Sequence, residues 1–260
     1  MTKPTIMVVL PSLGERLEYL ARALASCTKL SEFAEVTITL VVPDVASEAR
    51  VLGHRHQARV LSDPGNGMSA AINTALGSRD GQTYYIWLGD DDELVAEGIR
   101  DLVRALEKDS SATLAYGYCD YIDERGRTIG VNRAGSLASR LISWGPNLVP
   151  HPGTVVRLDA LVKSGGFDES LRFAMDLDMF LRIRTVGAFV HRPVMASRFR
   201  WHPKSATVAD RVASSREAMK VKKRYLPSFV RALSPLWNYP VAWVSWGASW
   251  LLTLRTNRSV

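Results

Sequence analysis

The sequence predicts an α/β fold with a mostly parallel central sheet, and two patterns carry that prediction. Short β-branched or aliphatic runs alternate with amphipathic helical segments through the first half of the chain, which is typical of βαβ units. One run, YYIWL at 84–88, stops at the triplet Asp90, Asp91 and Asp92. Ligands of open α/β sheets bind beyond the carboxyl ends of the strands, so the triplet marks the expected site.

The first half of the chain supplies four predicted strands with helices between them. The strands are expected at 5–10, 36–42, 58–61 and 84–88. Apolar residues at helical spacing predict helices over 13–27, 47–54, 69–76 and 95–107. The run SDPGNGM at 62–68 is rich in turn formers and separates the third strand from its helix.

The second half departs from a purely parallel arrangement. Strand-like segments at 113–122 and 127–131 flank a turn and predict an antiparallel hairpin. The Pro-rich segment 136–152 is expected to be irregular, either as a loop over the site or as an ordinary connection. The remaining expected elements are strands at 154–157 and 194–201, a helical turn at 158–164, and helices at 175–186 and 210–225.

The C-terminal tail has an unusual composition. No charged residue lies between Arg231 and Arg255, and four of the seven tryptophans fall there: Trp237, Trp243, Trp246 and Trp250. Two prolines limit an uninterrupted helix to 241–254, which is shorter than the roughly 20 residues of a membrane span. Three alternatives stay open: an amphipathic helix at a membrane interface, packing on the protein's own core or on a second copy, and a true span.

Composition and charge narrow the class of protein. A hydrophobic content of 47% with 23% charged residues indicates a globular chain and excludes wholesale disorder. The two cysteines have no metal-site or disulfide spacing, and the N-terminus lacks an export signal, so a cytoplasmic location is expected. The net charge of +7 is uneven, because 179–260 holds fifteen Lys/Arg against two Asp/Glu. This basic third predicts contact with phosphates or an anionic membrane, and by itself leaves nucleic acid open.

The aspartate triplet admits two interpretations. Three adjacent carboxylates repel one another, and a divalent cation held through oxygen ligands would relieve that repulsion. Alternatively, the aspartates only cap and polarise the helix that follows them.

Four separated blocks, in order, resemble the family 2 glycosyltransferases, which are inverting enzymes of the GT-A type that use nucleotide sugars. The blocks are VVLPSLGERLEYLARAL at 8–24, SDPGNGMSAAINTALGSRDGQTYYIWLGDDDEL at 62–94, HPGTVVRLDALVKSGGFDESLRFAMDLDMFLRI at 151–183 and RFRWHPKSAT at 198–207. The resemblance covers about 5–225. It implies a Rossmann-like GT-A domain over 1–208 with a small antiparallel part, followed by a basic helix and a Trp-rich amphipathic tail over 209–260.

The resemblance implies a metal site at the triplet. Asp90 and Asp92 form its Asp-x-Asp pattern and would hold Mn²⁺ or Mg²⁺, which suits their oxygen ligands. His202 would be an additional imidazole ligand by the same resemblance. The alternative for His202 is an ordinary surface histidine.

The resemblance also implies a set of residues that bind the nucleotide sugar. Asp90 and Asp91 lie in it, together with four residues at strand ends: Pro11, Asp44, Asp63 and Gly65. Arg198 and Arg200 alternate along a predicted strand and therefore face one side, where guanidinium groups would suit phosphate. A solvated strand edge is the competing interpretation.

Asp176, in the segment AMDLD at 174–178, is the implied general base. A carboxylate suffices for this role, because an acceptor hydroxyl becomes acidic only as its bond to the sugar forms. Asp176 also sits at the start of a predicted helix, so a helix cap is the alternative. Asp178 points elsewhere on the helix and is expected to be structural.

The implied activity is metal-assisted transfer of a sugar, with inversion, from UDP-sugar or another nucleoside-diphosphate sugar to a glycan or lipid-linked acceptor in cell-envelope polysaccharide or glycolipid synthesis. The protein is then expected at the inner face of the cell membrane, with contact through its tail, and a homodimer stays open. The alternative is a non-catalytic basic protein of the same fold that binds membrane or nucleic acid. The intact carboxylates argue against it, so nucleic acid is not expected as a partner.

Overall fold

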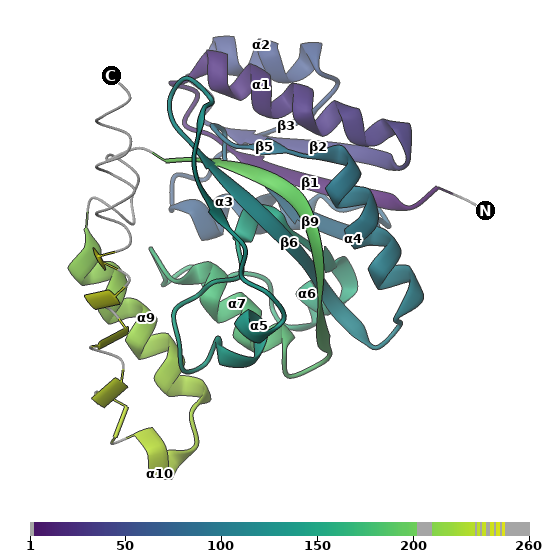
Figure 1. Cartoon of the computed structure of the whole chain (residues 1–260). Helices are drawn as coiled ribbons and strands as arrows, with labels where there is room; N and C mark the ends of the chain where they lie inside the picture. Colours follow the sequence, from purple (N-terminus) through teal and green to yellow (C-terminus); the bar gives the residue numbers. More distant parts are fainter. Residues whose placement is uncertain are drawn as a thin grey trace.

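A computed structural model describes residues 3–201 and 210–231, together with the pairs 233–234, 236–237, 240–241, 243–244 and 246–247. The fold is organised around one nine-stranded sheet with helices on both faces (Figure 1). The strand order is β3-β2-β1-β4-β8-β6-β9-β5, and β7 pairs with β6 outside this path. The predicted α/β class is confirmed.

One half of the sheet is parallel, as the sequence predicts. Its strands are β1 (Thr5–Pro11), β2 (Glu35–Val42), β3 (Arg59–Ser62) and β4 (Tyr84–Trp87). All three pairings among them are parallel. The connections carry α1 (Leu17–Thr28), the short η1 (Lys29–Glu32), α2 (Ser47–Arg55) and α3 (Met68–Gly77). This half therefore presents the carboxyl ends of its four strands along one edge.

The other half mixes directions. β8 (Thr154–Arg157) runs antiparallel to both β4 and β6 (Ala112–Ile122), and β7 (Thr128–Asn132) closes the predicted hairpin with β6. β9 (Ala188–Arg200) is parallel to β6. Three short elements complete this half: β5 (Glu93–Leu94), α5 (Leu137–Leu141) and η2 (His151–Gly153).

The predicted start of the last strand at 194 is wrong. β9 begins at Ala188, and its pairing with β6 shifts in register between His191 and Met195, where Pro193 lies. A proline cannot donate to the ladder and is tolerated at such an irregularity. The proline therefore interrupts the sequence pattern without ending the strand.

The core lies on both faces of the sheet. Alternate residues of β1 point to opposite sides, so Val8 packs with α1 and α4 (Ala96–Lys108), whereas Met7 packs with α3 and α7 (Met175–Ile183). The short α6 (Leu158–Lys163) belongs to the second layer. Burial on both faces explains why the parallel strands read as continuous apolar runs.

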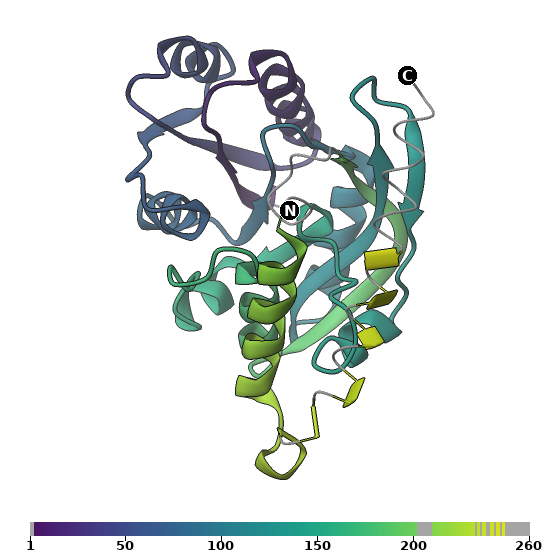
Figure 2. The same cartoon turned by 90° about the vertical axis from the view of Figure 1, so that its left-hand side faces the viewer.

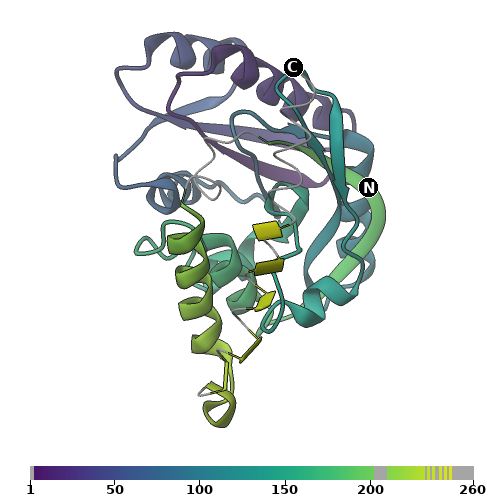
Figure 3. The same ribbon diagram turned by 60° about the vertical axis from the view of Figure 1, so that its left-hand side comes forward.

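The basic helix α9 (Arg211–Tyr225) belongs to the globular body. Its Val221 is fully buried in the cluster that includes α7, and α9 stands on the side of the molecule away from α1 and α2 (Figures 2 and 3). The short α10 (Ser228–Arg231) follows it. The boundary at 208 stays a prediction.

Two of the tail tryptophans contact the body. Trp246 donates through Nε1 to Ser215 Oγ of α9 at 3.0 Å, and Trp237 lies 5.2 Å from Trp144, ring centroid to ring centroid. Trp243 is 70% exposed, and Trp250 lies outside the described residues. Among the described helices, none combines the length and the apolar character that crossing a membrane requires.

A close approach between α4 and β9 gives a test of this fold. A Cβ added at Gly98 would lie 1.8 Å from the backbone oxygen of Met195, and a backbone atom cannot rotate away. We expect Gly98→Ala to lower the free energy of unfolding by about 3 kcal/mol or more, measured by urea denaturation. The matched control is Gly77→Ala at the end of α3, where a Cβ meets nothing within 4 Å; it should be neutral or stabilising. Equal stability of the two variants would contradict the α4–β9 packing.

Candidate functional site

The carboxyl edge of the parallel strands gathers the predicted nucleotide-binding positions. Pro11 ends β1, Asp44 follows β2, and Asp63 follows β3. Asp44 Oδ1 accepts a 2.5 Å hydrogen bond from Ser62 Oγ, and Asp63 Oδ1 accepts one of 2.9 Å from the backbone N–H of Gly65. Because Gly65 has a φ of +75°, this turn favours glycine. The ends of β2 and β3 are therefore joined directly.

Asp90 and Asp91, after β4, share one cation. The Arg16 guanidinium approaches Asp90 Oδ1 through Nη2 and Asp91 Oδ2 through Nη1, both at 2.5 Å. Ser12 Oγ adds a 2.6 Å hydrogen bond to Asp90 Oδ2. Burial nevertheless raises the pKa of Asp90, and its contacts with Ser12 and Arg16 only partly offset this. Sequence reasoning missed Ser12 and Arg16, although both lie in the segment that leaves β1.

Asp92 turns into the protein instead of joining this pair. Its side chain is 1% exposed, and Oδ1 accepts a 2.9 Å hydrogen bond from the backbone N–H of Arg200. Oδ2 is buried and has no hydrogen-bond partner among the residues that the structure describes. Burial, followed by the charge of Asp91, raises the pKa of Asp92 well above its ordinary value. The structure thus brings Asp90 together with Asp91, whereas the sequence pattern paired Asp90 with Asp92.

The capping alternative for the triplet is wrong for α4. That helix begins at Ala96, its N-cap residue is Val95, and Glu93 and Leu94 form β5 between the triplet and the helix. The aspartates therefore lie too far upstream to cap it.

Arg198 and Arg200 share one side of β9, as their spacing predicts, because both reach Glu93. Their environments differ, however. Arg200 is 1% exposed, and its guanidinium donates to the carbonyl oxygens of Asp91 at 3.0 Å and Asp123 at 2.6 Å. The side chain of Arg198 is 50% exposed. Arg200 therefore holds the triplet in place, which departs from a phosphate-facing pair, and Arg198 is the arginine that faces solvent.

Asp176, the predicted general base, is the second residue of α7. Its Oδ1 accepts a 2.7 Å hydrogen bond from the backbone N–H of Leu177, and its Oδ2 accepts one of 2.9 Å from Asn147 Nδ2. Burial raises the pKa of Asp176 to about 6, against the lowering effect of these hydrogen bonds. The N-cap position of α7 belongs to Ala174. Asn147, within the loop whose role the sequence left open, is a neighbour that sequence reasoning missed.

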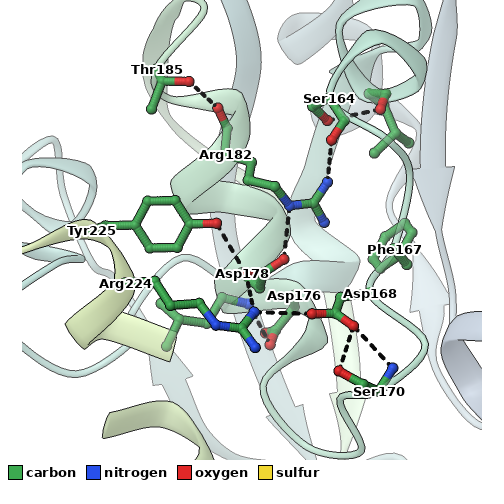
Figure 4. A network of polar contacts seen from close by, with 12 residues as sticks. Ser164, Phe167, Asp168, Ser170, Asp176, Asp178, Arg182, Thr185, Arg224 and Tyr225 are labelled. Atoms are coloured by element: carbon green, nitrogen blue, oxygen red, sulfur yellow. Dashed lines mark hydrogen bonds and ion pairs between the residues drawn. The ribbon is translucent and has the colours of Figure 1, made fainter. Parts of the chain in front are cut away.

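Asp178, two residues further on, is buried in a structural network (Figure 4). Its carboxylate accepts from Arg182 Nε at 2.8 Å, from the Tyr225 hydroxyl at 3.0 Å and from Arg224 Nη1 at 3.3 Å. These contacts agree with the structural role expected for Asp178.

Two contacts connect the Asp176 segment to the strand edge. Ser69, at the start of α3, donates to the backbone oxygen of Leu171 at 3.4 Å. Trp87, the last residue of β4, stacks on His151 with ring centroids 4.4 Å apart and an interplanar angle of 4°. Burial lowers the pKa of His151 to about 3, so this ring is neutral. The loop that carries Asn147 is thereby joined to the strand that leads into the triplet.

The predicted metal ligands are only partly brought together in the structure. His202 lies outside the described residues. Within the described part of the chain, no group of three His, Cys, Asp or Glu side chains is placed to hold a metal ion. Asp90 and Asp91, however, both contact the Arg16 guanidinium, and their oxygen donors are those that Mn²⁺ and Mg²⁺ prefer. The carboxylate oxygens of these two residues are therefore suitable ligands for a divalent cation.

The fold is of the GT-A type. The structure of the mannosyltransferase PcManGT from Pyrobaculum calidifontis with GDP-Man and Mn²⁺ matches with a TM-score of 0.64 at 15% identity, over 96% of this chain and 76% of that one. S. aureus TarS 1–349 with UDP-GlcNAc matches with a TM-score of 0.63 at 14% identity, over 87% of this chain and 69% of that one.

Residues 7–161 match the family model described as glycosyl transferase family 2, and the chain belongs to this family. Over 152 residues it is 30% identical to the chondroitin synthase of Pasteurella multocida (strain Pm70) and to the hyaluronan synthase of Pasteurella multocida. Each match covers 55% of this chain but only 14% of the relative.

The shared cation of Asp90 and Asp91 yields a prediction. Arg16→Ala removes the guanidinium that contacts both carboxylates, so the free energy of unfolding near neutral pH should fall by about 1–2 kcal/mol. Millimolar Mn²⁺ should raise the melting temperature of this variant more than that of the wild type, because the ion replaces the missing charge. Arg50→Ala, which removes a surface pair with the exposed Asp44, is the control. An identical Mn²⁺ effect on all three proteins would contradict the shared-cation interpretation.

Proposed function

We propose that the protein is an inverting, metal-assisted glycosyltransferase that moves a sugar from a nucleoside-diphosphate sugar to an acceptor hydroxyl. The observation that carries the proposal is Asp176, a partly buried carboxyl group whose pKa is raised to about 6. Its segment is joined to α3 through Ser69, and the loop that carries its partner Asn147 is joined to β4 through the Trp87–His151 stack. A base tuned close to neutral pH beside a ligand-binding edge is expected of an enzyme and is not needed for passive binding.

The donor would lie along the carboxyl edge of β1 to β4. Pro11, Asp44 and the Asp63–Gly65 turn would contact the nucleoside, since they follow neighbouring parallel strands. Arg198 is the exposed guanidinium available to phosphate. Two structures of the same fold are complexes with UDP-GlcNAc and with GDP-Man, which supports a nucleoside-diphosphate sugar as the donor class.

Asp176 would accept the proton of the attacking hydroxyl. Asn147 and the Leu177 N–H hold its two oxygens, and this fixes the orientation of the carboxylate. A directly positioned base and a hydroxyl attacking opposite the leaving diphosphate give inversion in one displacement. Proton transfer can lag behind bond formation, so a pKa of about 6 suffices.

Mn²⁺ or Mg²⁺ would be held by Asp90 and Asp91, with Asp92 behind them, and His202 remains a predicted further ligand. When bound, such an ion supplies positive charge that stabilises the departing diphosphate. Arg16 and Ser12 keep the Asp90 carboxylate in place on the protein side. The PcManGT structure is a complex with GDP-Man and Mn²⁺, which supports this choice of ion.

The acceptor is proposed to be a glycan or a lipid-linked glycan at the inner face of the cell membrane. Exposed apolar side chains near the C-terminus support a peripheral membrane contact: Phe229, Leu233, Leu236, Trp243 and Val244. The basic residues of 179–260 would favour anionic headgroups beside them. The two relatives are a chondroitin synthase and a hyaluronan synthase, which supports a role in polysaccharide synthesis.

Replacing the base tests the proposal. Asp176→Asn should bind nucleoside diphosphate as tightly as the wild type but lower kcat by roughly 10²–10⁴-fold, which is the usual contribution of a general base. The measurement is release of nucleoside diphosphate from a panel of nucleotide sugars with Mn²⁺. The control is Asp159→Asn, which removes an exposed carboxylate from α6. Wild-type turnover by the Asp176 variant would refute the assignment.

The raised pKa of Asp176 predicts a pH dependence. Below about pH 6 the carboxyl is protonated and cannot accept a proton, so kcat should fall on the acid side with a midpoint near 6. The folded state favours the neutral carboxyl, so its stabilising effect is present below the unfolded pKa near 3.8 and is lost as pH rises through about 6. Asp176→Asn should therefore melt at a higher temperature than the wild type above pH 6. A lower melting temperature there would contradict the burial argument.

A further inference from the structure

Helix α9 packs against α7, which carries Asp176, and both helices lie beyond residues 7–161 (Figures 1 and 4). Glu217 and Lys222 of α9 contact the segments that carry Asp176 and Asn147. Arg224 and Tyr225, at the end of the helix, contact the buried Asp178.

Glu217 of α9 binds the chain just before α7. Its Oε1 accepts hydrogen bonds from the backbone N–H groups of Phe173 at 2.6 Å and Ala174 at 2.7 Å, and Oε2 accepts one from Arg172 at 3.1 Å. Ala174 is the N-cap residue of α7 and has no side chain that could cap it. A carboxylate at a helix N-terminus is favourable, because the unpaired N–H groups point towards it. Glu217 thereby fixes the backbone two residues before Asp176.

Lys222 of α9 binds the loop on the other side of Asp176. Its Nζ donates to the backbone oxygen of Gly145 at 2.5 Å, and the residue is only 5% exposed. Gly145 lies two residues before Asn147, whose Nδ2 donates to Asp176 Oδ2. Burial lowers the pKa of Lys222 to about 8. An ammonium group that is costly to bury thus holds the loop that supplies the partner of Asp176.

The last turn of α9 attaches the helix independently of Asp176. Arg224 contacts Asp168 at 3.0 Å and Asp178 at 3.3 Å, and the Tyr225 hydroxyl donates to Asp178 at 3.0 Å (Figure 4). These contacts fasten α9 to Asp178 in α7 and to Asp168 before it. They provide a control that loosens the helix through bonds that involve neither Asp176 nor Asn147.

We propose that α9 is a positioning element of the catalytic centre, in which Glu217 and Lys222 hold Asp176 and Asn147 in the orientation that proton transfer requires. Neither side chain touches the reacting atoms. Glu217 sets the backbone from which Asp176 projects, and Lys222 sets the loop from which Asn147 donates. This inference rests on the proposed function, because it assigns a task to residues around the proposed base.

The test compares Glu217→Ala and Lys222→Met with the wild type. Release of nucleoside diphosphate is measured with whichever nucleotide sugar of the panel the wild type cleaves fastest. Both variants should lower kcat by about 10–100-fold, because small displacements of a reacting group are costly. Donor KM should change by less than about twofold, since the donor edge lies on other strands. Glu217→Gln keeps an acceptor oxygen of the same reach and should recover most of the lost kcat.

Tyr225→Phe is the control for general loosening of α9. It removes the hydroxyl bonded to Asp178, so it should lower the melting temperature and leave kcat within about twofold. Circular dichroism and thermal melting of each variant show that it is folded. The α9 inference is overturned if Glu217→Ala and Lys222→Met keep wild-type kcat, or if Tyr225→Phe lowers kcat as much as they do.

The experiment separates this inference from the proposed function. If the wild type releases no nucleoside diphosphate from any sugar of the panel, or if Asp176→Asn turns over normally, the proposed function fails. If Asp176→Asn is inactive while the two α9 variants remain fully active, only the role of α9 fails.

Discussion

The cost of burying neighbouring carboxylates is the constraint on which the site depends. Burial raises the pKa of both Asp90 and Asp92, and the charge of Asp91 adds to the rise, whereas cations and N–H donors that face them favour the charged forms. Arg16 supplies such a charge from the N-cap position of α1, and Arg200 supplies a backbone donor and a buried guanidinium from β9. The carboxylates at this edge of the sheet would therefore be stabilised further by a ligand or ion that adds positive charge. Such preorganisation is what stabilising a leaving diphosphate requires.

The two halves of the sheet have separate tasks. The parallel half aligns the carboxyl ends of four strands and so forms the edge proposed to bind the nucleotide sugar. The mixed half, with α7 packed on it, carries the proposed base. The halves are joined by the backbone pairing of β4 with β8, and the Trp87–His151 stack and the Ser69 hydrogen bond to Leu171 add side-chain contacts between them. The sheet pairing and these two contacts therefore set the position of the proposed base relative to the donor edge.

The basic C-terminal third is less available to ligands than its charge suggests. Arg182, Arg200, Lys222 and Arg224 all make contacts inside the protein, either with carboxylates or with backbone oxygens. Each balances or organises polar groups near the proposed site instead of facing phosphate. A count of charges cannot distinguish these internal roles from a ligand-binding surface, because the two differ only in where the side chain points.

The sequence alone determined the α/β class, the mostly parallel sheet, the hairpin, and the family, because hydrophobic period, turn residues and motif order are local properties. It also identified Asp176 and the aspartate triplet as the residues to consider. Tertiary structure alone decided which carboxylates face one another, since the turn after β4 directs Asp90 and Asp91 towards Arg16 and Asp92 inward. It alone revealed Asn147 and Glu217 beside Asp176, because these contacts join residues 29 and more than 40 positions apart in the chain. Pairings of this kind depend on how helices pack on the sheet, and no short-range pattern encodes them.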